Sequence, residues 1–163
     1  GASLAELTEA GEKLVEHINT LGVALYAATV PAVGHPGFEL AEDEIEFGVG
    51  IHGEPGYRKD KLKSADELAK ELVDKLKASF NWQSGDEYGI LVNGLGATPL
   101  MEQYIFLNSV QNILNEEGIK VAFYKVGNYM TALDMTGISL TMIRLEDPTW
   151  LKHLNSVADT AAW

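Results

Sequence analysis

The sequence contains no cysteine among its 163 residues. A disulfide, a thiolate nucleophile and a thiolate metal site are therefore all excluded. Proteins without cysteine are compatible with a reducing compartment, and we expect a cytoplasmic protein. Any chemistry that the chain performs must use its other side chains.

Basic residues are scarce. Twelve lysines and arginines face 24 aspartates and glutamates, which gives a formal net charge of −12 at pH 7. A surface with this charge repels phosphate backbones and anionic lipid headgroups. We therefore expect no nucleic acid and no membrane among its partners.

Long apolar runs are missing as well. No segment approaches the roughly 18 consecutive apolar residues that a membrane-spanning helix needs, and the N-terminus has no basic segment followed by an apolar one. The sequence thus predicts neither a membrane span nor a signal peptide. Gly1 stands in place of methionine, which is consistent with a trimmed or cleaved product.

What is present is an ordinary globular composition, with 46% hydrophobic and 22% charged residues. It suits one domain, 1–163, with a single core. Short apolar segments alternate with amphipathic ones, which predicts an α/β fold: a two-layer mixed β-sheet covered by helices on one face. The expected strands lie at 23–29, 44–51, 87–92, 119–126 and 137–145, and the expected helices at 3–20, 64–80, 99–117 and 148–154.

The connections between these elements predict the strand directions. The helices at 64–80 and 99–117 favour parallel neighbours, whereas strands 119–126 and 137–145, joined without a helix, are expected to be antiparallel. Capping boxes mark two helix starts, Ser3 with Glu6 and Ser64 with Glu67.

A glycine loop, residues 93–99, separates a strand from a helix. Thr98 is the expected N-cap and Pro99 the first helical residue, so backbone N–H groups could face an anion. Gly94 and Gly96 form half of a dinucleotide fingerprint, and no Gly-Lys-Ser/Thr follows. The motif therefore favours a tight turn that allows close packing of strand and helix.

An acidic run, residues 39–46, carries five carboxylates in eight positions. It lacks the alternating ligands and the turn glycine of a calcium loop. We expect a solvated acidic loop rather than a cation site.

A segment that overlaps the end of this run, residues 44–56, has the strongest functional pattern. Large apolar residues alternate with glutamates and glycines along a strand, and His52 follows on the parity of Gly48 and Gly50, which leave space beside it. Gly53, Pro55 and Gly56 then turn the chain. From the residues alone, this histidine is a ligand, a nucleophile or a turn residue.

The other three histidines give weaker signals. His17 and His153 lie between polar neighbours in expected helices and are expected at the surface. His35 precedes a Pro-Gly turn and could approach a site from its loop. The tail after residue 154 is expected to be loose unless Trp163 docks.

Three blocks together resemble one family. Gly-Val-Gly-Ile-His-Gly-Glu-Pro-Gly (48–56), Leu-Val-Asn-Gly-Leu-Gly-Ala-Thr-Pro-Leu (91–100) and Tyr-Met-Thr-Ala-Leu-Asp-Met-Thr-Gly-Ile-Ser-Leu-Thr (129–141) resemble the C-terminal half of the substrate-binding (K) subunit of dihydroxyacetone kinases. The resemblance implies the fold of that subunit's second domain, and the absence of the N-terminal domain of the parent protein.

For the chemistry, the resemblance implies that His52 holds dihydroxyacetone as a covalent hemiaminal, with Gly53 and Glu54 beside the substrate. No cofactor or metal is expected in this domain. ADP or ATP and magnesium would belong to a partner L subunit or domain, and the full-length protein is expected to be a homodimer.

Two functions remain open under this resemblance. The first is part of a kinase, most simply of the phosphotransferase-linked kind, whose isolated domain would be inactive. The second is a non-catalytic coactivator that senses dihydroxyacetone and acts on a transcription regulator. His52 is expected in both.

Overall fold

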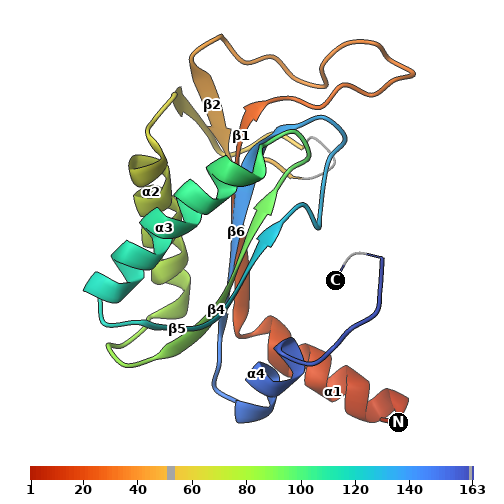
Figure 1. Cartoon of the computed structure of the whole chain (residues 1–163). Coiled ribbons are helices and arrows are strands. Elements are labelled where there is room, and N and C mark those ends of the chain that lie inside the picture. The colour runs from red at the N-terminus through yellow and green to blue at the C-terminus, as the bar shows by residue number, and fades with distance from the viewer. Residues whose placement is uncertain (51–53, 162) are drawn as a thin grey trace.

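The computed structural model describes residues 1–50, 54–161 and 163. Six strands form one sheet, and four helices accompany it (Figure 1). The fold is therefore the mixed α/β sheet that the sequence predicts. The strands are β1 (Ile18–Tyr26), β2 (Glu44–Phe47), β3 (Arg58–Lys61), β4 (Glu87–Gly94), β5 (Lys120–Gly127) and β6 (Thr136–Arg144), and the helices are α1 (Leu4–Val15), α2 (Ala65–Phe80), α3 (Leu100–Glu116) and α4 (Pro148–Leu154).

The strand order is β3-β2-β1-β6-β4-β5. Among the strands described, β4 and β5 are the parallel pair, joined by α3, and the other neighbours are antiparallel. The parallel prediction is confirmed for α3. It is wrong for α2, because three strands separate β3 from β4. Strands β5 and β6 run in opposite directions as predicted, although β4 lies between them.

Helices α2 and α3 pack side by side on one face of the sheet (Figure 1). Alternate residues of the central strands point toward them, including the fully buried Tyr88, Leu140 and Met142. The apolar stripe of α2 supplies Leu72 and Val73 to the same cluster. This layer is the main hydrophobic core, and it orients the sheet so that the opposite parity of each strand faces away from α2 and α3.

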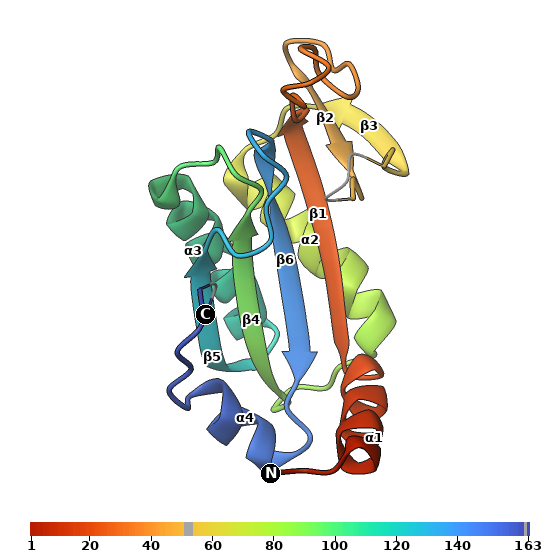
Figure 2. The same ribbon diagram turned by 90° about the vertical axis from the view of Figure 1, so that its right-hand side faces the viewer.

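That opposite parity forms a second surface, called the open face here (Figure 2). The strand register arranges it in three rows across β1, β6, β4 and β5. The first row is apolar, the second mixed, and the third small and polar. They are Ile18, Ile143, Gly89 and Phe123; then Thr20, Thr141, Leu91 and Lys125; then Gly22, Ser139, Asn93 and Gly127.

Helices α1 and α4 lie beside the apolar end of the open face (Figure 2). Lys13 of α1 pairs with Asp147 at 3.2 Å, and His17 after α1 contacts Glu146 at 3.0 Å. The sequence predicts that the helices cover one face of the sheet. This prediction is wrong for α1 and α4, which are held together beside the opposite face at one end of the sheet.

Strand β1 begins earlier than predicted. Helix α1 keeps its predicted capping box of Ser3 and Glu6 but ends at Val15, and the chain enters β1 at Ile18. Ile18 and Leu21 continue the helical apolar spacing in the sequence, yet they pair with Ile143 and Leu140 of β6. Strand pairing therefore overrides the local periodicity.

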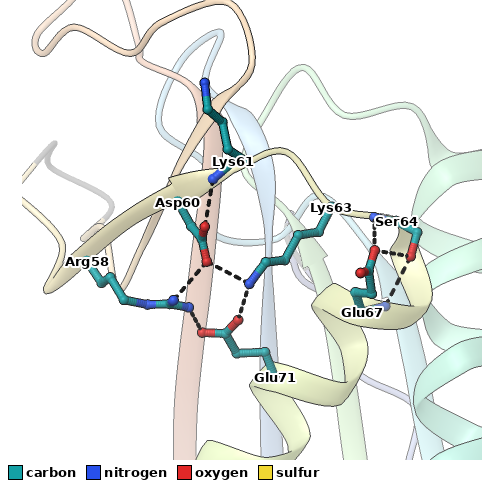
Figure 3. A network of polar contacts seen from close by, with 7 residues as sticks. All are labelled: Arg58, Asp60, Lys61, Lys63, Ser64, Glu67 and Glu71. Carbon is teal, nitrogen blue, oxygen red and sulfur yellow. Dashed lines mark hydrogen bonds and ion pairs between the residues drawn. The ribbon is translucent and has the colours of Figure 1, made fainter.

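Strand β3 is not among the strands that the sequence predicts. Its residues are charged on both faces because it is the outer strand of the sheet, paired with β2 alone. Arg58 and Lys63 each contact Asp60 and Glu71, with Lys63 2.7 Å from Asp60 and 3.0 Å from Glu71 (Figure 3). The Lys63 ammonium lowers the pKa of Asp60. Such charges block further strand pairing at this edge.

Candidate functional site

The predicted site residues His52 and Gly53 lie outside the described residues, as does Ile51. The chain on both sides is described. Gly50 precedes them and Glu54 follows them, and the Gly50 N–H donates to the Glu54 carbonyl oxygen at 3.3 Å. Gly50 and Glu54 are the two ends of the histidine segment, the name used here for residues 50–54. These two ends therefore lie together, beside the open face.

The glycines before His52 do not leave empty space, contrary to the prediction. A Cβ on Gly48 would lie 2.6 Å from the Tyr57 ring, and Gly48 has a φ of 80° that favours glycine. A Cβ on Gly50 would collide with the Glu54 carboxylate. Side chains of the returning segment fill both positions. The absence of a side chain at Gly50 is what allows the Glu54 carboxylate to lie against the backbone there.

A buried carboxylate anchors this connection. Glu46 is 5% exposed, and its Oε1 accepts a hydrogen bond from the Gly56 N–H at 2.8 Å. Gly56 lies so close to Phe47 that a Cβ would collide with the Phe47 carbonyl oxygen. The prediction of a solvated acidic run is therefore wrong at its last residue. Glu46 fixes the return of the chain from the histidine segment to β3.

A hollow of about 450 Å³ lies on the open face beside Gly48 and Gly50. Strands β1, β6 and β4 form its floor, and the segments after β2 and β5 form its walls. Its lining residues are Thr20, Leu21, Gly22, Gly48, Val49, Gly50, Leu91, Asn93, Leu95, Met130, Ser139 and Thr141. It is the described cavity that borders the chain leading directly into His52.

Hydroxyl groups supply the polar part of this floor. The hydroxyls of Thr20 and Thr141 lie 2.8 Å apart on adjacent strands, and the Ser139 hydroxyl accepts from the Asn93 side chain at 3.1 Å. A hydroxyl both donates and accepts, so the pair and Ser139 retain capacity for a polar ligand. The sequence gives one weak signal for this surface: Ser139 and Thr141, on one parity of β6, are smaller than the residues of the other parity.

Asn93 is a structural residue of the site. Its side chain, 2% exposed, accepts from the backbone N–H groups of Tyr129 and Met130 at 2.8 and 2.9 Å and donates to the Met130 carbonyl at 2.8 Å. These bonds hold the segment after β5 over the end of β4. Met130 is thereby placed at the wall of the hollow.

The glycine loop, residues 93–99, allows close packing of β4 and α3, as the sequence motif predicts. A Cβ on Gly94 would collide with Gln103 and Asn128, and one on Gly96 would collide with the Leu133 carbonyl oxygen. The predicted cap is wrong: Pro99 is the N-cap of α3. Thr98 is buried, donating to the Gly137 carbonyl at 2.6 Å and accepting from the Gly137 N–H at 2.8 Å. The Thr98 side chain therefore joins the loop to β6 instead of capping the helix.

The remaining histidines lie apart from the hollow. His17 is not a free surface residue: its ring contacts the Lys13 carbonyl and Glu146, and it packs edge-on against Trp150. His153 is exposed on α4, as predicted. His35 contacts the Pro36 carbonyl in an exposed loop.

The tail ends against the open face. Trp163 stacks on Phe123, with ring centroids 6.2 Å apart, and contacts Tyr129 and Lys125. Within the described chain, no group of three or more potential metal-ligating side chains is present, and no helix is long and apolar enough to cross a membrane.

Comparisons with known proteins identify relatives along the full chain. The Dak1 domain model matches residues 1–162. The dihydroxyacetone-binding subunit DhaK of a PTS-dependent dihydroxyacetone kinase from Lactococcus lactis is 60% identical over 162 residues, which cover 99% of this chain and 49% of that protein. This chain thus spans about half the length of such relatives.

Solved structures agree with this match. A dihydroxyacetone kinase operon co-activator, Dha-DhaQ, superimposes with a TM-score of 0.90 at 49% identity, covering 96% of this chain and 48% of that one. The dihydroxyacetone kinase of C. freundii, solved with AMP-PNP and Mg²⁺, gives 0.87 at 27% identity over all of this chain and 30% of its own. Relatives of both kinds share this fold.

Proposed function

The chain belongs to the Dak1 domain family, and from that premise we propose that it is the histidine-bearing domain of a dihydroxyacetone kinase subunit, in which His52 captures dihydroxyacetone as a hemiaminal. The observation that carries this proposal is the hollow of the open face, because its wall, Gly48–Gly50, leads directly into His52. A triose has six heavy atoms and needs a small fraction of that volume.

Capture requires a neutral imidazole. A ring nitrogen with a free lone pair adds to the carbonyl carbon, the C=O π bond breaks, and the oxygen becomes a hydroxyl. The proton that this oxygen gains is balanced by the proton that the other ring nitrogen loses. An acceptor near that second nitrogen would set the tautomer and stabilise the ring while the bond forms. The Glu54 carboxylate, held against Gly50, is one candidate. Its alternative role is to support the turn at Pro55.

Covalent capture also explains selection. Dihydroxyacetone and glycerol have nearly the same size and hydroxyl groups, so hydrogen bonds from Thr20, Ser139 and Thr141 would separate them poorly. A carbonyl is present in the ketone alone. The nucleophile therefore selects by chemistry, and the hydroxyls of the floor would orient what it holds.

Phosphoryl transfer would depend on partners. Transfer needs charged groups and metal ions around the nucleotide phosphates, and we propose that ADP or ATP with magnesium is bound by an L subunit or domain. We further propose that a domain preceding this chain in the parent protein completes the substrate site with Gly53 and Glu54, and that the complete subunit is a homodimer. The chain's span of about half its relatives supports such a parent protein.

The test is adduct formation with dihydroxyacetone labelled at its carbonyl carbon, followed by carbon NMR. The protein is this chain, alone and fused behind the unmatched half of the Lactococcus lactis subunit. We expect the labelled carbon to become tetrahedral with the unaltered fusion. The adduct should disappear in His52→Ala and persist in His35→Ala, a control at an exposed loop histidine. Undiminished capture by His52→Ala would exclude the proposed nucleophile.

A sensor function is the second candidate. The 49% identity to an operon co-activator, at a TM-score of 0.90, is as direct a structural match as the kinase relatives provide. In this reading His52 still binds the ketone, and the complex acts on a transcription regulator. Restoring turnover to an L subunit supports the kinase. Ketone-dependent binding to a regulator without any turnover supports the sensor.

A further inference from the structure

The apolar end of the open face contains an apolar groove. Its volume is about 520 Å³, and it lies between α1, α4, the tail and the first row of the sheet. Aromatic side chains of Phe123, Trp150 and Trp163 line it, with Leu14 of α1 at its edge. The groove is separate from the hollow beside Gly48 and Gly50, although both border Leu91 and Thr141.

Helix α1 continues this apolar surface outside the groove. Ala10, Gly11 and Leu14 line the groove, and Leu7 and Leu4 extend the same helical stripe by one and two further turns. Leu4 is 82% exposed and Leu7 is 59% exposed. All of α1 is described, and none of its residues is buried.

A short helix with an exposed apolar stripe is stabilised when that stripe packs against another surface. Isolated helices of fewer than about 12 to 15 residues are marginal in water, and most helical stability comes from packing of the apolar face. Helix α1 has 12 residues, and its end near Lys13 and His17 is linked to the rest of the chain by polar pairs and by contacts of both side chains with Trp150. Its apolar stripe is therefore suited to packing against a further surface.

The shape of the surface decides what kind of occupant fits. A small apolar molecule would fill the groove but would leave the protruding stripe of Leu4 and Leu7 in water. A protein surface covers groove and stripe together. Relatives such as the Lactococcus lactis subunit contain about as many residues outside the match as within it, which is enough chain for a covering domain.

We propose that the groove and the α1 stripe form the docking surface for the other half of the longer subunit. The inference rests on the proposed function, in which this chain is the second domain of such a subunit. The surface that docks is therefore expected to present an apolar patch to the groove and the stripe. Docked here, the companion domain lies on the open face and can reach the hollow beside Gly50.

The test compares this chain alone with the fusion behind the unmatched half of the Lactococcus lactis subunit, by hydrogen exchange. We expect amides of α1 and of 150–154 to exchange at least about tenfold more slowly in the fusion. The outer surfaces of α2 and α3 should be unchanged. Equal exchange of α1 in both proteins, or new protection on α2 and α3 instead, overturns the proposal.

A matched pair of variants tests the stripe itself. Leu7→Glu in the fusion should return α1 exchange to the rate of the chain alone, whereas Leu62→Glu, at a leucine of similar exposure (55%) before α2, should not. Neither change should lower the stability of the chain alone. Because that chain leaves the groove open, it should also bind anilinonaphthalene sulfonate, and Leu7→Glu should weaken the binding. A chain that binds none contradicts the proposal.

Two other occupants are outcomes of the same experiments. Self-association of the chain alone in sedimentation, abolished by Leu7→Glu, would assign the surface to a second copy. A fatty acid found by mass spectrometry in the purified fusion, with α1 unprotected, would assign it to a lipid. Either overturns the proposal. Adduct formation at His52 is measured on the same fusion, so loss of docking and loss of triose capture are distinguished.

Discussion

Tyr88 places a phenol in the centre of the core. It is 0% exposed, lies edge-on to Phe80 and Trp82, and its hydroxyl has no hydrogen-bond partner within the described chain. Burial raises the pKa of Tyr88 to about 12. The neutral phenol is thus retained at a cost, because an unpaired buried polar group opposes folding by about 1 to 3 kcal/mol.

We expect Tyr88→Phe to raise the free energy of unfolding at pH 7 by about 1 kcal/mol. The difference should widen by about 2 to 3 kcal/mol between pH 10 and 12. The sign follows from the raised pKa: the neutral phenol's contribution is complete below pH 10 and is lost as the pH rises toward 12, whereas phenylalanine does not titrate.

Urea unfolding of both proteins across this pH range measures the Tyr88 effect. Tyr124→Phe, at a residue 53% exposed, is the control and should change stability little at any pH. A destabilised Tyr88→Phe at pH 7 would show that the hydroxyl is satisfied in solution.

Gly96 is expected to be intolerant of any side chain. It has a φ of 142°, and a Cβ there would collide with the Leu133 carbonyl oxygen, which belongs to the backbone and has little freedom to move. Gly96→Ala should cost about 3 to 5 kcal/mol of stability. Gly85 also has a positive φ, 95°, but no atom lies within 4 Å of its Cβ position. Gly85→Ala should therefore cost about 1 to 2 kcal/mol. Equal costs in denaturant unfolding would show that conformation alone, and not the contact, selects glycine.

At the scale of elements, Asn93 joins the end of β4 to the segment after β5. Asn93→Ala removes four hydrogen bonds and leaves the N–H groups of Tyr129 and Met130 without that partner. We expect a loss of about 2 to 4 kcal/mol, with faster hydrogen exchange across residues 127–135. Asn155→Ala, at an exposed helix end, removes one local bond and should cost less than about 1 kcal/mol. Unchanged exchange in Asn93→Ala would mean that other contacts hold the segment.

The sequence predicted the elements that carry their own signals. Helix α2 shows a capping box and a stripe of apolar residues, and both are present in the structure. Strand β3 has no such signal, because its four residues are all charged and an outer strand of this kind shows no apolar alternation. The start of β1 was missed for the opposite reason: Ile18 and Leu21 continue the helical spacing of α1 but pair with β6.

The whole molecule determines what the sequence could not. The order of strands brings Thr20, Asn93 and Thr141 to one hollow, although more than 120 residues separate the first from the last. Local patterns identify the histidine segment, because glycines and proline mark it. They do not identify the floor of the hollow. Serines and threonines on a strand are common, and they form a polar surface here because their neighbours across the sheet are polar as well.

The last prediction concerns the chain as a unit of activity. Among the described residues, no group of three or more metal-ligating side chains is present, and transfer of a phosphoryl group needs cations and donors around the nucleotide. The hollow beside Gly50 also lies on the open face, where we place the companion domain. We therefore expect this chain alone to form no phosphorylated triose from ATP, magnesium and dihydroxyacetone, measured by coupled assay and by phosphorus NMR.

The fusion, supplied with the L subunit and its phosphoryl donors, should turn over, and the same fusion with His52→Ala should lose activity. Turnover by the chain alone would place the nucleotide site within these 163 residues and would overturn the division of labour proposed between the two subunits.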